Sequence, residues 1–366
     1  MEEHFSGPNY TLGIEEELMI LDGETLGLVN AVDRLLEDSE TGEIKPELLQ
    51  SVLEISTSPV RDVREAGVEL RALRRQVRDT ALRHGLTIGS AGTHPLALWE
   101  DQRVVGRPRY RELVSALRYV ARREIIFGLH VHVGLDDPDK AIHVANGMRV
   151  HLPVLVALAA NSPFWRGGNT GLASARTPIF RAFPRVGVPP AYADWDDYAR
   201  RISFMVESGV IEDYTWLWYD VRPHPDFGTV EIRAMDGQTR VEHTLALAAL
   251  VQAMVKELAE HFEAGEPLPD LPWEMLDENK WLAARHGLDG ELVDLPSRER
   301  VPARALARRL IDRLREHAED LGSADELAGI ADILDNGNGA ARQVLVYEAN
   351  EDYGEVLREI VAATVD

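Results

Sequence analysis

Four segments of the chain alternate between apolar and polar residues with a period of two, which is the pattern of half-buried β-strands. They span residues 11–22, 51–59, 127–134 and 228–236. Long insertions separate them, so they do not form regular βαβ units. The pattern therefore predicts a mixed or antiparallel sheet with helices on one side.

Helical spacing of apolar residues occupies much of the remaining chain. Gly85 and Gly265 follow two of these stretches and mark expected C-terminal stops. The predicted helices span residues 61–84, 138–160, 241–263, 302–321, 324–334 and 354–364. Loops rich in glycine and proline are expected at residues 161–190, 265–273 and 335–340.

The first predicted strand carries two carboxylates on one face, because side chains alternate between the faces of a strand. Glu15 and Glu17 point one way, and Glu16 is a charged exception on the opposite face. The rest of that opposite face consists of Leu12, Ile14, Leu18 and Ile20. Two carboxylates on one face indicate either a solvent-exposed face or a cation between them.

The third predicted strand places two histidines on one face, His130 and His132, flanked by Gly128 and Gly134. The opposite face is wholly apolar and consists of Phe127, Leu129, Val131, Val133 and Leu135. Histidine is a common metal ligand, and glycine leaves room for a ligand. This pair favours a functional site over a structural role.

The other two strands follow the same rule. Glu54 shares a face with Ser56 and Ser58, and Glu231 shares a face with Arg233. Each strand alone could be an ordinary half-exposed strand. Together, the four predict one sheet with a dry face under helices and a polar face lined by Glu, His and Arg.

Carboxylate oxygens with few nitrogens suit Mg²⁺ or Mn²⁺ better than zinc. The chain has no cysteine and no H-E-x-x-H motif, both of which are typical of zinc sites. P-loop, dinucleotide-binding and nucleophile-elbow motifs are also missing from the sequence. A nucleotide site would have to be of another kind.

Composition narrows the class of protein. The 366 residues are 45% hydrophobic and 28% charged, which is ordinary for a globular protein. The formal net charge of −23 disfavours nucleic acid and anionic membranes as partners. Residues 1–10 do not read as a signal peptide, and the most apolar window, 150–160, is far shorter than a membrane span. We expect a soluble, cytoplasmic protein.

At these residues the sequence resembles the type 2 glutamate–cysteine ligases, also called carboxylate–amine ligases, of the glutamine synthetase superfamily. The resemblance covers nearly the whole chain. It rests on GIEEE at 13–17, EISTSP at 54–59, GTHP at 92–95, HVHVG at 130–134, ANSPFW at 160–165, TGLASAR at 170–176, TVEIR at 229–233, ENKW at 278–281 and GNGAARQ at 337–343.

The resemblance implies an α+β fold of the glutamine synthetase type. Its curved, mainly antiparallel sheet would carry helices on the convex face and the active site on the concave face. Residues 1–366 would form a single catalytic domain.

The resemblance also assigns residues to roles. The implied metal ligands are Glu15, Glu17, Glu54, His130 and Glu231. The implied nucleotide-binding residues are His132, Arg233 and Arg342, of which His132 lies near the phosphates. Arg176 and Arg233 would be catalytic cations that hold phosphate or a substrate carboxylate, and Asn161 and Ser162 would bind substrate with Arg176. Asn338 belongs to the last motif without an assigned role.

The reaction implied is an ATP- and Mg²⁺-dependent (or Mn²⁺-dependent) ligation. ATP phosphorylates a carboxylate, and an amine attacks the acyl phosphate to form a γ-glutamyl amide. Glutamate is the expected acid and cysteine or another amine the second substrate, with residues 167–190 as a cover that excludes water. Assembly into a homo-oligomer is left open.

Two other interpretations remain. A non-catalytic homologue would bind nucleotide or amine without turnover. A metal-dependent hydrolase would use His130 and His132 as zinc ligands, although such a site needs further histidines or aspartates on strands.

Overall fold

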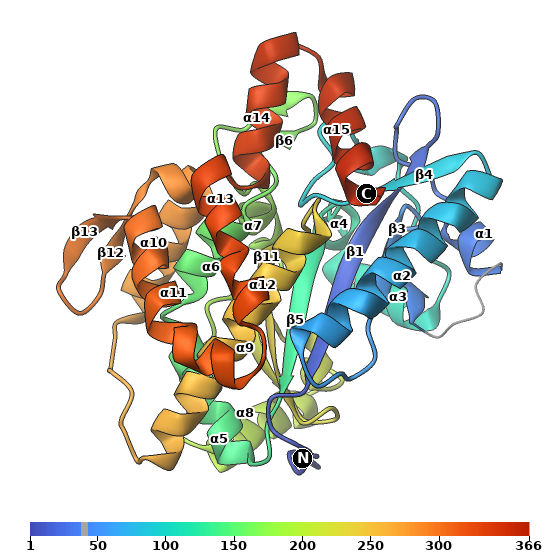
Figure 1. The fold of residues 1–366 in the computed structure, drawn as a ribbon. Coiled ribbons are helices and arrows are strands. Elements are labelled where there is room, and N and C mark those ends of the chain that lie inside the picture. Colours follow the sequence, from blue (N-terminus) through green and yellow to red (C-terminus); the bar gives the residue numbers. More distant parts are fainter. Residues whose placement is uncertain (38–42, 366) are drawn as a thin grey trace.

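The protein is built around a seven-stranded antiparallel sheet (Figure 1). A computed structural model describes residues 1–37 and 43–365. All four predicted strands are present, as β1 (Leu12–Asp22), β3 (Val52–Ser56), β5 (Gly128–Gly134) and β11 (Thr229–Asp236). The three strands that were not predicted are β2 (Ile44–Pro46), β4 (Leu86–Gly89) and β10 (Val221–His224). The order is β10-β11-β5-β1-β3-β2, and β4 pairs with β1.

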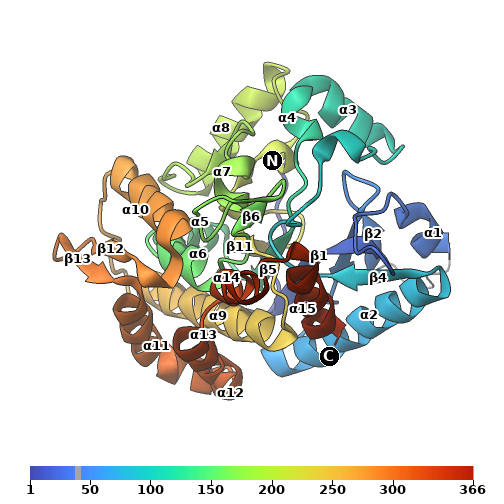
Figure 2. The same cartoon turned by 90° about the horizontal axis from the view of Figure 1, so that it is seen from above.

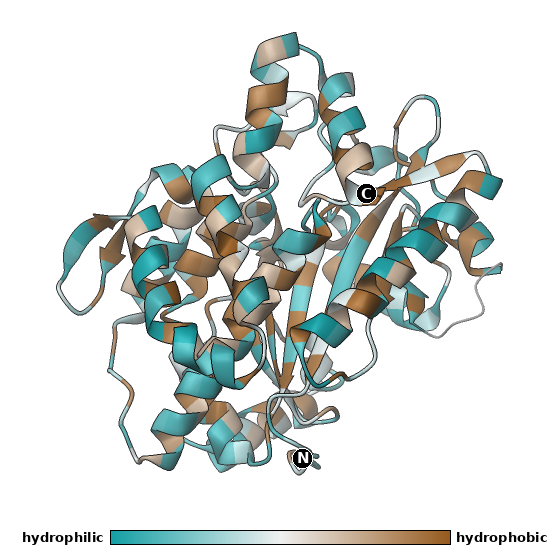
Figure 3. Cartoon of the chain, viewed as in Figure 1, coloured by the Kyte–Doolittle hydropathy of each residue, from teal (hydrophilic) through white to brown (hydrophobic). Residues whose placement is uncertain are grey.

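The helix face of the sheet is the face that carries Leu12, Ile14, Leu18, Leu129 and Val131, all of which are buried. Four helices pack on this face: α2 (Val63–Arg83), α5 (Pro138–Met148), α6 (Leu152–Ala159) and α9 (Val241–Glu263). The C-terminal helix α15 (Tyr353–Val365) packs on β4, beside Met19 and Leu21. α9 is buried around most of its circumference, because α11 (Ala303–Asp320) and α12 (Ala324–Ala328) cover its outer side (Figure 2). Figure 3 shows largely hydrophilic colouring on the outward surfaces of α2 and α11.

The opposite face is called the site face here, and it carries Glu15, Glu17, His130, His132 and Glu231. The structure confirms the predicted division of the strands between polar and apolar faces, with two corrections. Phe127 precedes β5 and packs with Met19 and Leu21 in a separate apolar cluster, so it does not belong to the helix face. Ser58 lies beyond the end of β3 and hydrogen-bonds Glu69 of α2, so it does not join Glu54 on the site face.

Glu16, the charged exception on the helix face, is fully buried in an ion pair with Arg74 of α2. Nε and NH2 of Arg74 lie 2.8 and 2.7 Å from the two carboxylate oxygens. The other N–H groups of Arg74 donate to the carbonyls of Gln238, Thr239 and Thr364. One side chain thus connects β1 to the segment after β11 and to the C-terminal helix.

The predicted helix at 138–160 is wrong as a single element. It is broken into α5 and α6, which meet at an angle of 63°. Pro153 lies in the first turn of α6, where a missing N–H is tolerated, so the proline marks a helix start. Among residues 1–37 and 43–365, no single helix is long and apolar enough to cross a membrane, and this bent pair meets the criterion only when both parts are counted together.

The predicted helices elsewhere are confirmed within a few residues, except that 324–334 is divided into α12 and α13 (Ile330–Asn336). The predicted loop at 335–340 is wrong at both ends, because α13 extends to Asn336 and α14 (Gly339–Asn350) begins inside it. α14 is followed by α15 (Tyr353–Val365), which packs against it (Figure 1). The other helices are α1 (Val32–Glu37), α3 (Pro108–Leu117), α4 (Tyr119–Arg122), α7 (Arg176–Phe180), α8 (Trp195–Glu207) and α10 (Trp273–His286).

Short strand pairs and single turns of 3₁₀-helix complete the fold. The pairs are β6 (Phe164–Trp165) with β7 (Gly168–Asn169), β8 (Val186–Gly187) with β9 (Trp218–Tyr219), and β12 (Glu291–Asp294) with β13 (Glu299–Pro302). The 3₁₀ turns are Trp99–Asp101, Tyr214–Trp216 and Gly287–Asp289. The predicted loop at 161–190 therefore contains short elements.

The two faces of β5 lead to opposite expectations for neighbouring residues. Val131→Ala should lower the free energy of unfolding by roughly 1–3 kcal/mol, because a fully buried side chain is truncated and a cavity is left. His132→Ala should cost at most about 1 kcal/mol, because its ring makes one hydrogen bond, to Thr229. Urea unfolding followed by circular dichroism measures both, and a larger loss for His132→Ala would show that the faces are inverted.

Candidate functional site

The site face borders a cavity of about 410 Å³. Six glutamates line it, against four arginines and three histidines. The glutamates are Glu15, Glu17, Glu47, Glu54, Glu124 and Glu231, and the arginines are Arg109, Arg176, Arg222 and Arg233. Carboxylates outnumber guanidinium groups, so the cavity suits a ligand that brings positive charge, such as a cation or an ammonium group.

Strand register brings distant charged residues side by side. Glu15 of β1 lies opposite His130 of β5, and Glu17 lies opposite Glu54 of β3. On the other side of β5, His132 lies opposite Glu231 of β11. The four predicted strands therefore converge in one place through antiparallel pairing, and all five implied metal ligands line the same cavity.

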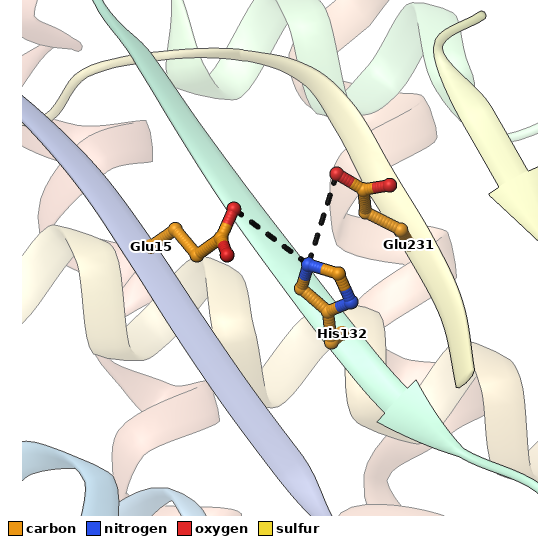
Figure 4. Close-up of side chains that lie close together, drawn as sticks. All are labelled: Glu15, His132 and Glu231. Carbon is orange, nitrogen blue, oxygen red and sulfur yellow. Dashed lines mark ion pairs between the residues drawn. The ribbon is translucent and has the colours of Figure 1, made fainter. Parts of the chain in front are cut away.

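Glu15, His132 and Glu231 form a compact group of potential metal ligands (Figure 4). Their ligand atoms all lie within 4.8 Å of one another. His132 Nε2 is 3.7 Å from Glu15 Oε2 and 3.7 Å from Glu231 Oε1, and it has no hydrogen-bond partner among the described residues. The resemblance gave His132 to the nucleotide and His130 to the metal, whereas the geometry groups His132 with the two carboxylates.

The other ring nitrogens in this region are fixed by neighbours. His132 Nδ1 is 3.1 Å from the hydroxyl of Thr229, which leaves Nε2 directed at the carboxylates. His130 Nδ1 is 3.3 Å from Glu15. Burial by itself would raise the pKa of Glu15, but the hydrogen bond with His130 and the electrostatic interaction with His132 hold that pKa well below its usual value.

Two arginines neutralise Glu231. Arg222 Nε donates to Glu231 Oε2 at 2.7 Å, and the Arg233 guanidinium donates to Oε1. Although burial opposes ionisation, the charges of Arg222 and Arg233 keep the pKa of Glu231 far below its ordinary value. Glu231 is therefore a permanent carboxylate, and its free lone pairs still face His132.

The acids on the β1–β3 side lack such partners. Burial and the charges of Glu15 and Glu47 raise the pKa of Glu54 well above the usual range, and Lys45, at 3.8 Å, offsets this only in part. Burial and the charge of Glu17 raise the pKa of Glu47 to about 7. In this half of the cavity, burial and neighbouring acids therefore oppose ionisation of Glu54 and Glu47.

These features fit a hard divalent cation. The donors are carboxylate oxygens with one imidazole, and the unpartnered His132 Nε2 lies between two of the carboxylates at distances too long for hydrogen bonds. A zinc hydrolase would need His130 and His132 together as ligands, but only His132 belongs to this group. The site chemistry favours Mg²⁺ or Mn²⁺ over zinc.

Arg176 reaches the cavity from the start of α7, within the predicted covering segment. Its NH2 donates to the Arg233 carbonyl at 3.3 Å, and a side chain at Gly128 would meet that NH2 at 2.6 Å. The room that Gly128 leaves is thus taken by Arg176. Phe180 and Phe183 from the same segment also line the cavity, as expected of a cover.

Asn161 and Ser162 do not line the cavity. Both are fully buried beside Asp236: the Asn161 N–H and the Ser162 hydroxyl donate to it at 2.8 and 2.7 Å. The Asn161 side chain also bonds Gly237 and Gln343. The structure therefore does not bring these two predicted substrate-binding residues to the site, and their contacts position the segment that leads to Arg176.

Arg342 also lies outside the residues that line the cavity. Its NH2 donates to Asp332 at 2.7 Å, and its Nε donates to the Gly337 carbonyl at 3.0 Å. Asn338 caps α14 by accepting from the Ala341 N–H. The C-terminal motif thus forms the start of α14, and Arg342 is not among the residues that line the cavity proposed to bind the nucleotide.

Sequence reasoning missed Glu47, Glu124, Arg222 and His224. Arg222 and His224 alternate with Val221 and Pro223 just before the fourth predicted strand, and that alternation was an available signal. The proline fits an edge strand, which β10 is. Glu47 and Glu124 lie outside long strands and carried no periodic signal.

A family model for glutamate–cysteine ligase family 2 matches residues 11–363. A relative from Rubrobacter xylanophilus, provisionally named glutamate–cysteine ligase 2-1, is 42% identical over 369 residues, covering 100% of this chain and 97% of its own length. A Sorangium cellulosum relative, provisionally named glutamate–cysteine ligase 2, is 42% identical over 357 residues, covering 96% of this chain and 95% of its own.

Solved structures share the fold. A glutamate–cysteine ligase from Francisella tularensis in complex with AMP has a TM-score of 0.72 at 16% identity, covering 99% of this chain and 89% of that one. A bifunctional glutathione synthetase from Pasteurella multocida has a TM-score of 0.70 at 14% identity, covering 98% of this chain and 51% of that one. These likenesses confirm the predicted fold class.

Two acids on opposite sides of the cavity, Glu231 of β11 and Glu54 of β3, should respond oppositely to neutralisation. Glu231→Gln should lower the free energy of unfolding by roughly 3–5 kcal/mol, because Arg222 and Arg233 would lose their buried partner. Glu54→Gln should be neutral or stabilising at neutral pH without divalent metal, because it removes an acid whose ionisation burial and the neighbouring carboxylates oppose.

The raised pKa of Glu54 also predicts how the stability of the protein changes with pH. Since the pKa of Glu54 is raised in the folded protein, the wild type loses stability as pH rises from about 4.5 through the folded pKa. Glu54→Gln should lack that loss. Urea unfolding at several pH values in EDTA tests both variants, and a strongly destabilised Glu54→Gln would contradict the charge assignment.

Proposed function

Because the chain belongs to the glutamate–cysteine ligase family 2, we propose that it is a Mg²⁺-dependent ligase that uses ATP to join the carboxylate of glutamate to an amine. The observation that carries the proposal is the convergence of carboxylates, His132 and arginines on one cavity wall. Residues 1–366 would act as a single catalytic domain, since one apolar cluster contains residues from Phe5 to Leu334.

The divalent ion would be held by Glu15, His132 and Glu231. Glu17 and Glu54 would extend the site along β1 and β3. When bound, the metal supplies positive charge to phosphate oxygens. Mg²⁺ usually keeps part of its shell for substrate phosphates, which agrees with a site of few protein ligands. Without that charge, the crowded carboxylates would repel ATP.

Arg233 and Arg176 would bind the groups that become more negative during the reaction. Arg233 is fixed by Glu231, and Arg176 lies beside it through the Arg233 carbonyl. Fixed guanidinium groups stabilise charge on a transferring phosphoryl group without rearranging. His132, which lies between the two carboxylates, would lie near the phosphates of ATP.

The acid must be activated before it can form an amide. ATP would transfer its terminal phosphoryl group to the side-chain carboxylate of glutamate, and the amine nitrogen would then attack the acyl carbon as phosphate leaves. Phe180, Phe183, Trp216 and Trp218 form an aromatic wall of the cavity. This wall would exclude water, which would otherwise hydrolyse the acyl phosphate.

Glutamate and cysteine are the proposed substrates, because the family and the named relatives point to them. Cysteine is the weaker of the two proposals, since nothing among the lining residues selects a thiol. A different amine would leave the activation chemistry unchanged.

The central test combines turnover with isotope transfer. The purified protein, given ATP, Mg²⁺, cysteine and glutamate labelled with oxygen-18 in its carboxylates, should form the dipeptide and release labelled phosphate. Glu15→Gln should lower kcat/KM on the order of 100-fold or more, because one anionic metal ligand is lost. The exposed Glu24→Gln is the control. Dipeptide without label in phosphate would overturn the acyl-phosphate step, and label transfer only with another amine would overturn cysteine.

Arg176 provides a second test. Arg176→Lys keeps the charge but loses the planar fork that binds a carboxylate through two hydrogen bonds, so the KM for glutamate should rise roughly 10-fold. The KM for ATP should change little. Arg201→Lys, on the exposed side of α8, is the matched control. An unchanged KM for glutamate would remove Arg176 from the acid-binding site.

A further inference from the structure

Glu124 is a cavity residue that neither the metal group nor the arginine pairs involve. It lies between α4 and β5 and lines the 410 Å³ cavity. Its neighbours Ala121 and Ile125 are fully buried in the apolar cluster that contains Phe127. The backbone is therefore held in place, and the Glu124 side chain projects from a fixed support.

The carboxyl group of Glu124 is buried without a partner. The residue is only 7% exposed, and neither Oε1 nor Oε2 has a hydrogen-bond partner among the residues that the structure describes. Burial raises its pKa to about 8, although the charges of Arg123 and Arg176 oppose the shift. A buried, unsatisfied carboxyl group costs stability, so its presence needs another explanation than folding.

A second unsatisfied group lies in the same cavity. Arg176 is 4% exposed, and its Nε also lacks a partner among the described residues. It is close enough to Glu124 for its charge to act on that carboxyl group. A carboxylate and a guanidinium, both buried and both with free hydrogen-bonding capacity, are the complement of a zwitterionic amino acid.

We propose that Glu124 is the counter-ion for the primary ammonium group of an amino-acid substrate, with Arg176 available for a carboxylate. The inference rests on the proposed ligase function and specifies how the cavity recognises its substrate class. Two substrate groups share this chemistry: the α-ammonium of the acid and the ammonium of the incoming amine. Both would form a charge-assisted hydrogen bond with the same carboxylate.

A divalent metal ion is a less suitable partner for the Glu124 carboxyl group than an ammonium group is. Glu124 is not part of the group formed by Glu15, His132 and Glu231. The guanidinium charges of Arg123 and Arg176 act on it more strongly than the carboxylate of Glu17 does. An ammonium group carries one charge and three donors, which suits one carboxylate with two free oxygens.

The test compares wild type with Glu124→Gln, which keeps the shape but cannot ionise against an ammonium group, and with Glu112→Gln on the exposed surface of α3 as the control. One arm compares glutamate with glutarate, which lacks the amino group, as substrate or competitive inhibitor. The other compares cysteine with hydroxylamine, which is uncharged at neutral pH and traps acyl phosphates as hydroxamates.

If the ammonium belongs to the acid, Glu124→Gln should raise the KM for glutamate roughly 10- to 100-fold and leave glutarate unchanged. If it belongs to the amine, the KM for cysteine should rise by a similar factor while hydroxamate formation persists. In both cases the Mg²⁺ dependence and the ATP affinity should match wild type. The melting temperature should not fall, because no partner is lost.

Equal kinetic constants for Glu124→Gln and wild type with all four ligands would overturn the proposal. So would a raised Mg²⁺ requirement, which would make Glu124 a metal ligand, or a clear loss of melting temperature, which would make it structural. Calorimetric binding of glutamate, glutarate and cysteine without ATP keeps the inference separate from the ligase function. A protein without ATP turnover would overturn the function, whereas unchanged ammonium selectivity in Glu124→Gln would overturn this site alone.

Discussion

The buried pair between Glu16 and Arg74 is the interaction on which the rest of the architecture depends. Arg74 uses its N–H groups for both oxygens of Glu16 and for three carbonyls after β11 and in α15. Because side chains alternate along a strand, burying Glu16 under the helices forces Glu15 and Glu17 to the opposite face. The orientation of the carboxylates proposed to bind metal is therefore set by an ion pair on the other side of the sheet.

The site face then divides its negative charge into two environments. Glu231 is held ionised by two arginines, whereas Glu54 and Glu47 face other acids and have raised pKa values. The first arrangement gives a fixed ligand that does not depend on pH near neutrality. In the second arrangement, ionisation of Glu54 and Glu47 is unfavourable until a bound cation offsets their charge. Metal binding and stability should therefore be coupled in this half of the cavity.

Several residues of the family motifs act at a distance from the cavity. Asp236 accepts hydrogen bonds from Asn161, Ser162 and Ser174, and a side chain at Gly92 would come within 2.6 Å of its carboxyl group. This buried network joins the end of β11 to the segment that begins α7, and so it fixes where Arg176 enters the cavity. A motif residue can thus matter for chemistry through position, without touching a substrate.

The sequence by itself determined the four main strands, their faces and the residue types of the site, because a period of two is a local property that neighbouring residues carry. It could place Glu15, His130, His132 and Glu231 on polar faces, but it could not say which side chains meet. That was decided by register: antiparallel pairing sets His132 against Glu231, and one extra residue in β11 between Ile232 and Met235 shifts the pairing beyond Arg233. Glu124 and Glu47 reach the cavity from irregular segments, and Asn161 and Arg342 turn away from it, since long-range packing carries no periodic signal along the chain.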